Sequence, residues 1–213
     1  MTALAFSRDG RRLATGCGEP SRTGQLKIWD VPSGSLVREF SEAHSDAILV
    51  LEFSHDGRHL ATGAADRFMK VFAVESGKLV RVFEGHTHHV LGVSWSADDR
   101  TLATGGADKV IKIWDFLTGD QKRTIPGFGK EVTAVRFVAD TPNVVASCGD
   151  NGVYLKQTDN GAAVRTYAGA GDFVFSVDVS GDGKTIVASS QDGVLRIWSE
   201  TGQLTAAFGL GGR

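Results

Sequence analysis

Hydrophobic residues along this chain come in short runs, separated by turns that are rich in Gly, Asp and Ser. Between residues 85 and 125 the runs are Val90–Trp95, Leu102–Thr104, Val110–Trp114 and Gln121–Ile125. Short runs with β-branched and aromatic residues predict strands, and an Asp-Gly pair such as Asp56–Gly57 suits the tight turn between two of them. No stretch carries apolar residues at helical spacing for long enough to predict a helix.

This four-strand pattern is written five times. The last strand of each unit ends on an apolar residue at an interval of 41 to 43 residues, at Phe40, Phe83, Ile125, Tyr167 and Phe208. A repeat of about 40 to 45 residues is typical of a solenoid or a propeller. Such a unit cannot bury its own faces and has to stack on its neighbours. We expect one domain over 1–213, with units at 1–40, 41–83, 84–125, 126–167 and 168–208.

The third unit is the fullest copy, GHTHHVLGVSWSADDRTLATGGADKVIKIWDFLTG from Gly85 to Gly119. Its Gly-His start, Ala-Thr-Gly-x-x-Asp middle and Ile-Trp-Asp end resemble the WD-repeat β-propeller family, and the resemblance extends over essentially the whole chain. It implies an all-β fold of five four-stranded antiparallel blades. The chain opens on an innermost strand at Thr2–Phe6 and closes after an outer strand at Leu204–Phe208, so we expect no overlapping closure strand. Either five blades close on themselves or, as we favour, they are part of a larger ring.

In that family a hydrogen-bond relay joins His, Asp, a Ser or Thr, and Trp within a blade. The resemblance, carried over residue by residue, gives a relay of His86, Thr104, Asp108 and Trp114 in the third unit; His44, Thr62 and Asp66 in the second; and Asp192 and Trp198 in the fifth. The second unit has Phe72 where Trp would stand, the fourth keeps only Asp150, and the first keeps Thr15 and Trp29. Buried polar groups need partners, so we expect these residues to be scaffold. A catalytic triad is disfavoured because the same trio recurs in adjacent units.

The resemblance also implies a binding face, formed by the loops that lead into each inner strand and by the turns between the second and third strands. Its residues are Asp46, Leu49, His88, His89, Leu91, Lys130, Glu131, Asp172, Phe173, Phe175 and Gln191. A mixture of aromatic, His and charged residues is typical of a protein-binding patch. Packing between blades is the alternative for Phe173 and Phe175, because they alternate with valines. Phe128 replaces the relay His of the fourth unit, and we expect it to fill the core.

Composition narrows the function further. The chain has 23 basic and 25 acidic residues and a net charge of −2, which disfavours nucleic acid and anionic membranes as partners. No apolar run is long enough to span a bilayer, and the N-terminus does not resemble a signal peptide. Cys17 and Cys148 are too far apart to indicate a metal site. Residues 86–89 contain three His, but the relay claims His86, so we expect no metal and no cofactor.

Three functions are consistent with these features. The first is a non-catalytic protein–protein interaction scaffold, whose partner is another protein or a domain of the same polypeptide, with self-association through uncovered end blades. The second is a structural segment of a larger protein, because two stretches resemble WD-repeat regions of large bacterial proteins that carry c-type cytochrome domains. No CxxCH motif occurs, so haem would belong to a neighbouring domain. The location would then be periplasmic, and cytoplasmic otherwise. The third is a propeller enzyme, which is disfavoured because the inner strands offer mostly Ala and Val, with Glu52, Arg136 and Asp178 as scattered exceptions.

Overall fold

The computed structural model describes residues 2–209, and of residues 41 and 42 only the backbone. It has twenty strands in five antiparallel sheets, each made of four consecutive strands. Blade 1 contains β1 (Ala3–Phe6), β2 (Arg12–Glu19), β3 (Thr23–Asp30) and β4 (Leu36–His44). Blade 2 contains β5 (Ile48–Phe53), β6 (His59–Ala64), β7 (Met69–Ala73) and β8 (Leu79–Phe83). Blade 3 contains β9 (Val90–Trp95), β10 (Thr101–Gly106), β11 (Ile111–Asp115) and β12 (Gln121–Ile125). Blade 4 contains β13 (Val132–Phe137), β14 (Asn143–Cys148), β15 (Val153–Gln157) and β16 (Ala163–Tyr167). Blade 5 contains β17 (Val174–Val179), β18 (Thr185–Ser190), β19 (Val194–Ser199) and β20 (Leu204–Gly209).

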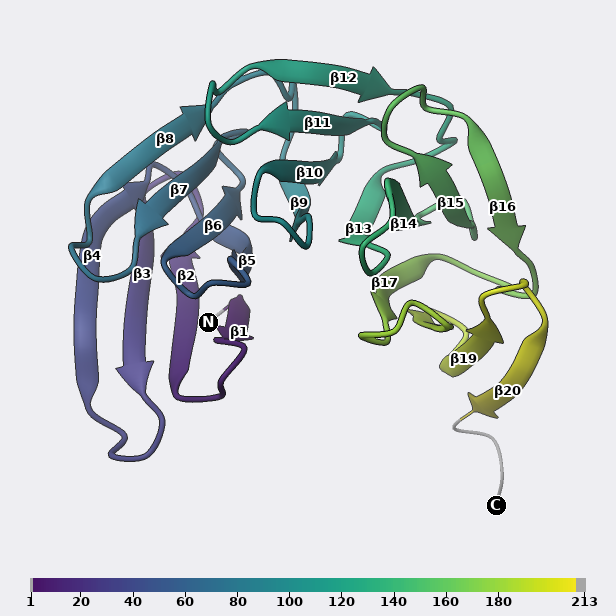
Figure 1. Cartoon of the computed structure of the whole chain (residues 1–213), viewed down its shortest axis with the longest axis horizontal. Helices are drawn as coiled ribbons and strands as arrows, with labels where there is room; N and C mark the ends of the chain where they lie inside the picture. Colours follow the sequence, from purple (N-terminus) through teal and green to yellow (C-terminus); the bar gives the residue numbers. More distant parts are fainter. Residues whose placement is uncertain (1, 210–213) are drawn as a thin grey trace.

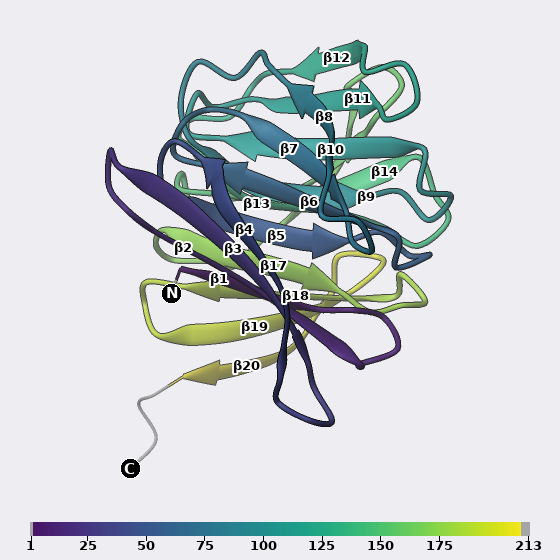
Figure 2. The same ribbon diagram turned by 90° about the vertical axis from the view of Figure 1, so that its left-hand side faces the viewer.

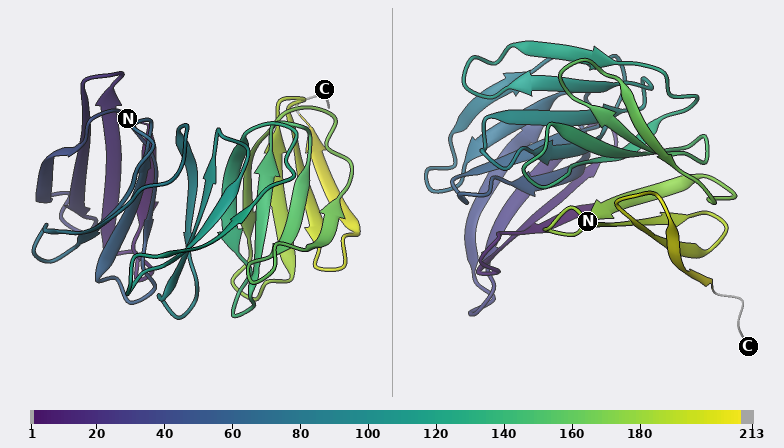
Figure 3. Two further views of the ribbon diagram at one scale, coloured as in Figure 1. Left: turned by 90° about the horizontal axis from the view of Figure 1, so that it is seen from above. Right: turned by 45° about the vertical axis from the view of Figure 1, so that its right-hand side comes forward.

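The blades form an open arc. Their first strands lie along its inner edge and their last strands along its outer edge, and blades 1 and 5 do not meet (Figure 1). Seen from above, the blades stand side by side in sequence order (Figure 3), and the view from the side of blade 1 shows the same stacking (Figure 2). Within the described residues, β1 pairs only with β2 of its own sheet. The all-β fold of five four-stranded blades is therefore confirmed, and the ring is not closed.

The hydrophobic core is divided among the junctions between blades. Four clusters of buried residues are present, and each combines side chains from two successive blades. In the junction between blades 1 and 2, for example, Leu26 and Ile28 pack with Ile48 and Leu51. Burying one such side chain contributes about 1.5–3 kcal/mol. A blade therefore depends on its neighbours for most of its apolar contacts, as the repeat pattern predicts.

Blade 1 carries an inserted segment, residues 17–24. This segment extends the hairpin of β2 and β3, with Cys17 opposite Gln25 and Glu19 opposite Thr23. The fourth strand lengthens too, and β4 continues to His44, past residue 40. No described helix is long and apolar enough to cross a membrane.

Candidate functional site

The relay of blade 3 is complete in the structure. His86 Nδ1 lies 2.9 Å from both carboxylate oxygens of Asp108, and its Nε2 lies 2.7 Å from Thr104 Oγ1. The indole N–H of Trp114 donates to the same Thr104 oxygen at 2.9 Å. An ionised carboxylate can only accept, so Nδ1 carries the imidazole proton and Nε2 accepts from the Thr104 hydroxyl. Each member is therefore satisfied by the others.

Burial keeps the relay histidines neutral. Desolvation lowers the pKa of His86 below its ordinary value, although Asp108 opposes the change. Burial likewise lowers the pKa of His44 in blade 2. Both nitrogens of the His86 imidazole are engaged, Nδ1 by the carboxylate and Nε2 by the hydroxyl.

Blade 2 shows that the relay can form without its Trp. His44 contacts Asp66 through Nδ1 at 2.9 Å and Thr62 through Nε2 at 2.7 Å. Although burial opposes it, the hydrogen bond from His44 holds the pKa of Asp66 below its usual range. Phe72 fills the Trp position and packs edge-to-face on Phe40 at 5.3 Å between ring centroids. An aromatic ring at this position therefore supplies packing in either blade, and the indole N–H of a Trp adds a hydrogen bond to it.

The other three blades replace the missing relay members in different ways. In blade 4, Phe128 is buried and stacks edge-to-face on Tyr154, whose hydroxyl donates to Asp150 at 3.1 Å. In blade 5, Arg196 takes the place of His and binds Asp192 through both terminal nitrogens, at 2.7 and 3.1 Å. These bonds lower the pKa of Asp192.

Two relay tryptophans outside blade 3 also find acceptors. Trp198 cannot reach a hydroxyl, because Ala188 stands at that position, and it donates to the Ala168 carbonyl at 2.9 Å. Trp29 of blade 1 donates to Thr15 Oγ1 at 2.9 Å. Blades 1 and 3 thus share the bond from Trp to Thr, whereas the Trp of blade 5 uses a backbone carbonyl.

The predicted binding face contains a repeated irregularity. In blades 2 to 5 the pairing of the first two strands shifts by one residue near the start of the first strand. The residue that this bulge leaves unpaired is Leu49, Leu91, Thr133 or Phe175, at equivalent positions. A bulge re-aims the side chain that it carries. Leu49 and Leu91 are half-buried, and Phe175 is 53% exposed.

Other residues of this face differ in accessibility. His88, Lys130, Asp172 and Gln191 are exposed, and His89 and Glu131 are half-buried. Asp46 is half-buried and is already engaged, because it accepts a hydrogen bond from the Ser21 amide of the inserted hairpin at 2.9 Å. Phe173 packs against the backbone of Gly149 in blade 4, where a Cβ would meet its ring at 2.6 Å. Phe173 thus packs between blades, which is the alternative to contact with a partner that the sequence left open, whereas Phe175 is open to solvent.

The inner edge of the arc holds a charged cluster whose members come from three blades and are far apart in the sequence. Arg136 of blade 4 lies 3.6 Å from Glu52 of blade 2 and 3.4 Å from Asp178 of blade 5. It also donates to the carbonyls of Val93 and Val135, at 3.1 and 3.0 Å. These residues border a cavity of about 430 Å³. Arg136 therefore ties four successive blades together.

The carboxyl of Glu52 is a weaker acid in this cluster than an exposed glutamate. Burial raises the pKa of its carboxyl to about 7, against the opposing charge of Arg136. One carboxyl oxygen accepts long hydrogen bonds from Ser94 and the Trp95 amide at 3.4 Å, and the other, Oε2, has no hydrogen bond among the described residues. The carboxyl is consequently balanced between its charged and neutral forms near neutral pH.

Comparison with known families agrees with this geometry. The profile of the WD domain, G-beta repeat (WD40), matches residues 1–30, 34–72, 77–115 and 161–199, together more than half of the chain. The chain belongs to the WD40 repeat family. A search of the curated proteins found no match. WD40 domains are generally protein-interaction scaffolds, and nothing among residues 2–209 groups three or more His, Cys, Asp or Glu side chains that could hold a metal ion.

The WD40 match omits most of blade 4, although that blade has all four strands. Its sequence has Phe128, Ala146 and Lys156 where the repeat has His, a hydroxyl and Trp. Ala146 is fully buried, and the Lys156 ammonium lies 5.6 Å from the centroid of the Phe128 ring. Apolar packing and a cation–π contact thus stand in for the relay, which explains how a blade forms where the repeat signature is lost.

Proposed function

We propose that this WD40 domain is a non-catalytic protein-binding scaffold, and that its binding face is the edge that carries the bulges of blades 2 to 5. The observation that supports the proposal most strongly is the repeated bulge, which presents Leu49, Leu91 and Phe175 from three blades at equivalent positions. Regular pairing would leave these side chains in the alternating pattern of the strand. The bulges re-aim Leu49, Leu91 and Phe175 and so offer apolar contacts at one edge of three blades. The fourth bulge residue, Thr133, donates instead to the Val174 carbonyl of the next blade at 2.7 Å.

The chemistry around these residues suits a protein partner. The exposed His88, Lys130, Asp172 and Gln191 lie in the loops and turns of this edge and add groups of both charges and amide and imidazole donors to its apolar side chains. An apolar centre with a polar rim is the usual organisation of a protein interface, and aromatic residues such as Phe175 supply much of the binding energy. Balanced overall charge disfavours nucleic acid as the partner.

A direct test compares two single variants in quantitative pull-down from cell extract with mass spectrometry. Phe175→Asp alters the proposed face, and Leu117→Asp places the same charge on the opposite edge, at a residue that is 56% exposed. We expect a defined set of proteins to be lost with Phe175→Asp and retained with Leu117→Asp, followed by direct binding of the purified partner. Equal recovery by the two variants would reject this face as the binding surface.

A second candidate function follows from the two ends of the arc. Leu4 and Phe6 of blade 1 are 56% and 57% exposed, whereas Leu51 and Phe53, at the equivalent positions of blade 2, are 4% and 6% exposed. The difference arises because a preceding blade covers only the latter pair. We propose that another blade covers blade 1 in the assembled protein, supplied by a second copy of the chain or by another segment of a larger protein.

Such an assembly would accommodate the second hypothesis from the sequence. The domain would be a structural part of a larger bacterial protein, and any c-type haem would be held by a neighbouring domain. The test of this idea is the solution mass of the purified chain over a dilution series. A concentration-dependent increase supports self-association, and a monomer at all concentrations restricts the proposal to other segments.

A further inference from the structure

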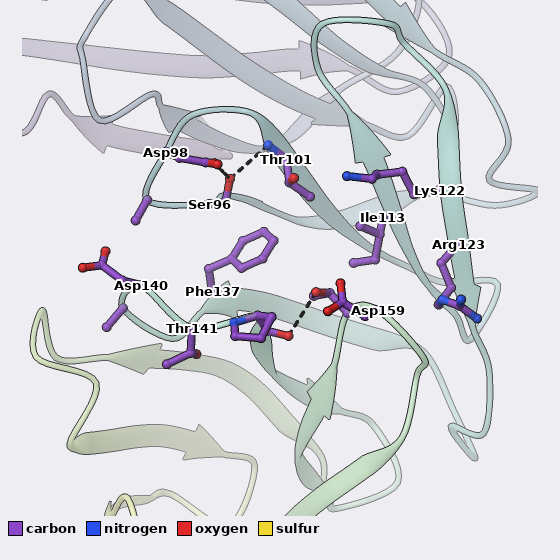
Figure 4. Close-up of a pocket in the computed structure, with 14 residues that line it drawn as sticks. Ser96, Asp98, Thr101, Ile113, Lys122, Arg123, Phe137, Asp140, Thr141 and Asp159 are labelled. Atoms are coloured by element: carbon purple, nitrogen blue, oxygen red, sulfur yellow. Dashed lines mark hydrogen bonds between the residues drawn. The ribbon is translucent and has the colours of Figure 1, made fainter.

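A cavity of about 660 Å³ lies between blades 3 and 4, and the proposed binding face does not include it. It is bordered by the turns that join first to second strands and third to fourth strands, whereas the bulges lie at the other end of the first strands. Phe137 lies in the middle of the lining, with Ile113 on one side and Asp140 on the other (Figure 4). We call this cavity the 3–4 slot. Its size is within the range of about 300–1,000 Å³ that ligand pockets have.

The slot lies where the preceding junction has an aromatic wedge. In the preceding junction the same space is filled by His59 of blade 2 with Trp95 and Phe116 of blade 3. His59 lies 4.9 Å from Phe116, and Trp95 lies 5.0 Å from Phe116, between ring centroids. The equivalent residues of the next junction are Thr101, Phe137 and Thr158, all of which line the slot. Two rings are thus replaced by two threonines, and only one aromatic side chain remains.

An arginine that bonds to the following blade at the other junctions has no such bond here. Arg38, Arg81, Arg123 and Arg165 occupy the same position in the fourth strand of blades 1 to 4. Three of them donate to carbonyls in the turn of the following blade. Arg38 binds Glu75 at 2.6 Å, Arg81 binds Leu117 at 2.8 Å, and Arg165 binds Glu200 at 2.5 Å.

The side chain of Arg123 makes no hydrogen bond or ion pair with any described residue, and it lines the 3–4 slot instead. The turn that it would bind contains Gly161, whose nearest side chain is Ile125, whereas Gly77, Gly119 and Gly202 each contact the arginine of the preceding blade. The guanidinium is therefore available to an anionic group that enters the slot. A guanidinium is suited to binding a carboxylate through two parallel hydrogen bonds.

The remaining charges lie on two sides of the rim of the slot. Lys122 and Arg123 of β12 lie on one side in Figure 4 together with Asp159, so that two cations face one carboxylate there. Asp98 and Asp140 lie across Phe137 from them. Asp140 has no hydrogen bond or ion pair within residues 2–209 and is exposed. A ligand that fits this rim carries a carboxylate toward the arginine, a cation toward the two aspartates, and an apolar group between them.

We propose that the 3–4 slot binds an extended peptide segment in which one aromatic side chain lies between an acidic and a basic residue. The aromatic ring replaces the wedge that His59 and Phe116 form in the preceding junction and packs on Phe137. The acidic residue binds Arg123 and Lys122, and the basic residue faces Asp98 and Asp140. Side chains two positions apart on an extended chain point the same way, so an acidic-x-aromatic-x-basic order presents all three together.

The probe is a fluorescein-labelled synthetic peptide with a central Trp, Glu two positions before it and Lys two positions after it, together with the peptide of reversed charge order. Binding to the full chain is followed by fluorescence anisotropy. We expect saturation by one charge order with a dissociation constant below about 1 mM, and a loss of at least about tenfold when Ala replaces the Trp. If neither order binds, or if Ala binds equally well, the proposal is wrong.

Variants then locate the site on the chain. Arg123→Ala is expected to weaken peptide binding about tenfold or more without lowering the urea midpoint, because Arg123 has no partner to lose. Arg165→Ala is the matched control, since it breaks the equivalent bond to Glu200 in the next junction. It should lower the urea midpoint and leave peptide affinity unchanged. The opposite pattern would assign Arg123 a structural role and overturn the proposal.

Filling the slot gives a second test that keeps the arginine. Thr158→Phe restores the residue type of Phe116, and Thr101→His restores that of His59, so that either variant can be used if the other does not fold. Each should reduce peptide affinity at least about tenfold. Thr185→His makes the same change at the equivalent residue of blade 5, which is exposed, and should leave binding unchanged. Undiminished binding by a folded slot variant would place the peptide elsewhere.

Discussion

Leu195 and Phe208 lie opposite each other across β19 and β20, and they are 40% and 60% exposed. The preceding blades each bury the pair at this position: Leu26 with Phe40, Met69 with Phe83, Ile111 with Ile125 and Val153 with Tyr167. In blades 1 to 4 the next blade covers the pair. Blade 5 thus presents the apolar surface that a blade uses to hold its successor, and no described residue covers it.

This surface is expected to drive association. Replacing both residues, as Leu195→Asp with Phe208→Asp, should reduce the solution mass measured by light scattering at high concentration, because a charge opposes burial of the face. Leu117→Asp is the control, as Leu117 is 56% exposed but lies in a turn outside this face. The prediction is contradicted if the double variant associates as strongly as the unmodified chain.

In the blade 3 relay, the hydroxyl of Thr104 should matter more than the indole N–H of Trp114. Thr104→Val leaves His86 Nε2 and the Trp114 N–H without their partner, which should lower the free energy of unfolding by about 1–3 kcal/mol. Trp114→Phe reproduces the state of blade 2, where Phe72 packs without an indole. It should cost less than the Thr104 change. Urea midpoints at unchanged slope measure both, and a larger loss for Trp114→Phe would show that packing dominates.

Trp114→Ala and Trp198→Ala should be similarly destabilising, although only Trp114 belongs to a complete relay. The Trp198 indole also has an acceptor, because it donates to the Ala168 carbonyl at 2.9 Å. Both tryptophans are buried and both have an acceptor. Truncation should therefore cost a similar amount in the two blades, about 3–5 kcal/mol each. A difference of more than about 2 kcal/mol in the urea-derived free energies would contradict this equality.

The strands could be predicted from the sequence because each depends on local pattern and repetition. The predicted Val90–Trp95 and Gln121–Ile125 coincide with β9 and β12. The 3–4 slot could not be predicted in this way. It depends on which side chains of two blades meet. Nothing in the sequence distinguishes Thr101 and Thr158 from other strand and turn residues. Their effect on the slot becomes clear only from the structure, in which His59 and Phe116 fill the equivalent space. Likewise, the lack of a partner for the Arg123 side chain becomes clear only when the four equivalent arginines are compared in three dimensions.

The inner-edge cluster escaped sequence reasoning for a related reason. Glu52, Arg136 and Asp178 stand at the same position of three repeats, but a shared position does not show how far one arginine side chain reaches. The long side chain of Arg136 spans the space between blades 2 and 5. Asp46 is engaged by the Ser21 amide of the inserted hairpin in blade 1. Aligning repeats reveals shared positions, but it does not reveal these contacts.

Glu52 should make the fold less stable as the pH rises from about 4.5 to about 7. Its folded-state pKa is raised to about 7 from 4.5, so the neutral acid favours the fold. This contribution is complete below pH 4.5 and lost above pH 7. The Glu52 side chain is 25% exposed, and solvent reduces the effect of the pKa shift on stability. We therefore expect the free energy of unfolding to change by about 2 kcal/mol. Glu52→Gln should remove this slope from urea unfolding measured over that range, and an unchanged slope would contradict the assignment.

The relay histidines should produce a pH dependence of opposite sign. Burial lowers the folded-state pKa of His44 and His86 below the ordinary value of 6.5, so the unfolded chain takes up protons first as the pH falls. Their contribution to stability is therefore complete above pH 6.5 and is lost as the pH falls through the folded-state values. In the Glu52→Gln background, the urea midpoint should decline below pH 6.5, and adding His86→Gln should make that decline shallower. Gln can still donate to Asp108 and accept from Thr104, so the relay geometry is retained. A decline of the same steepness with His86→Gln would mean that this imidazole does not resist protonation in the folded chain.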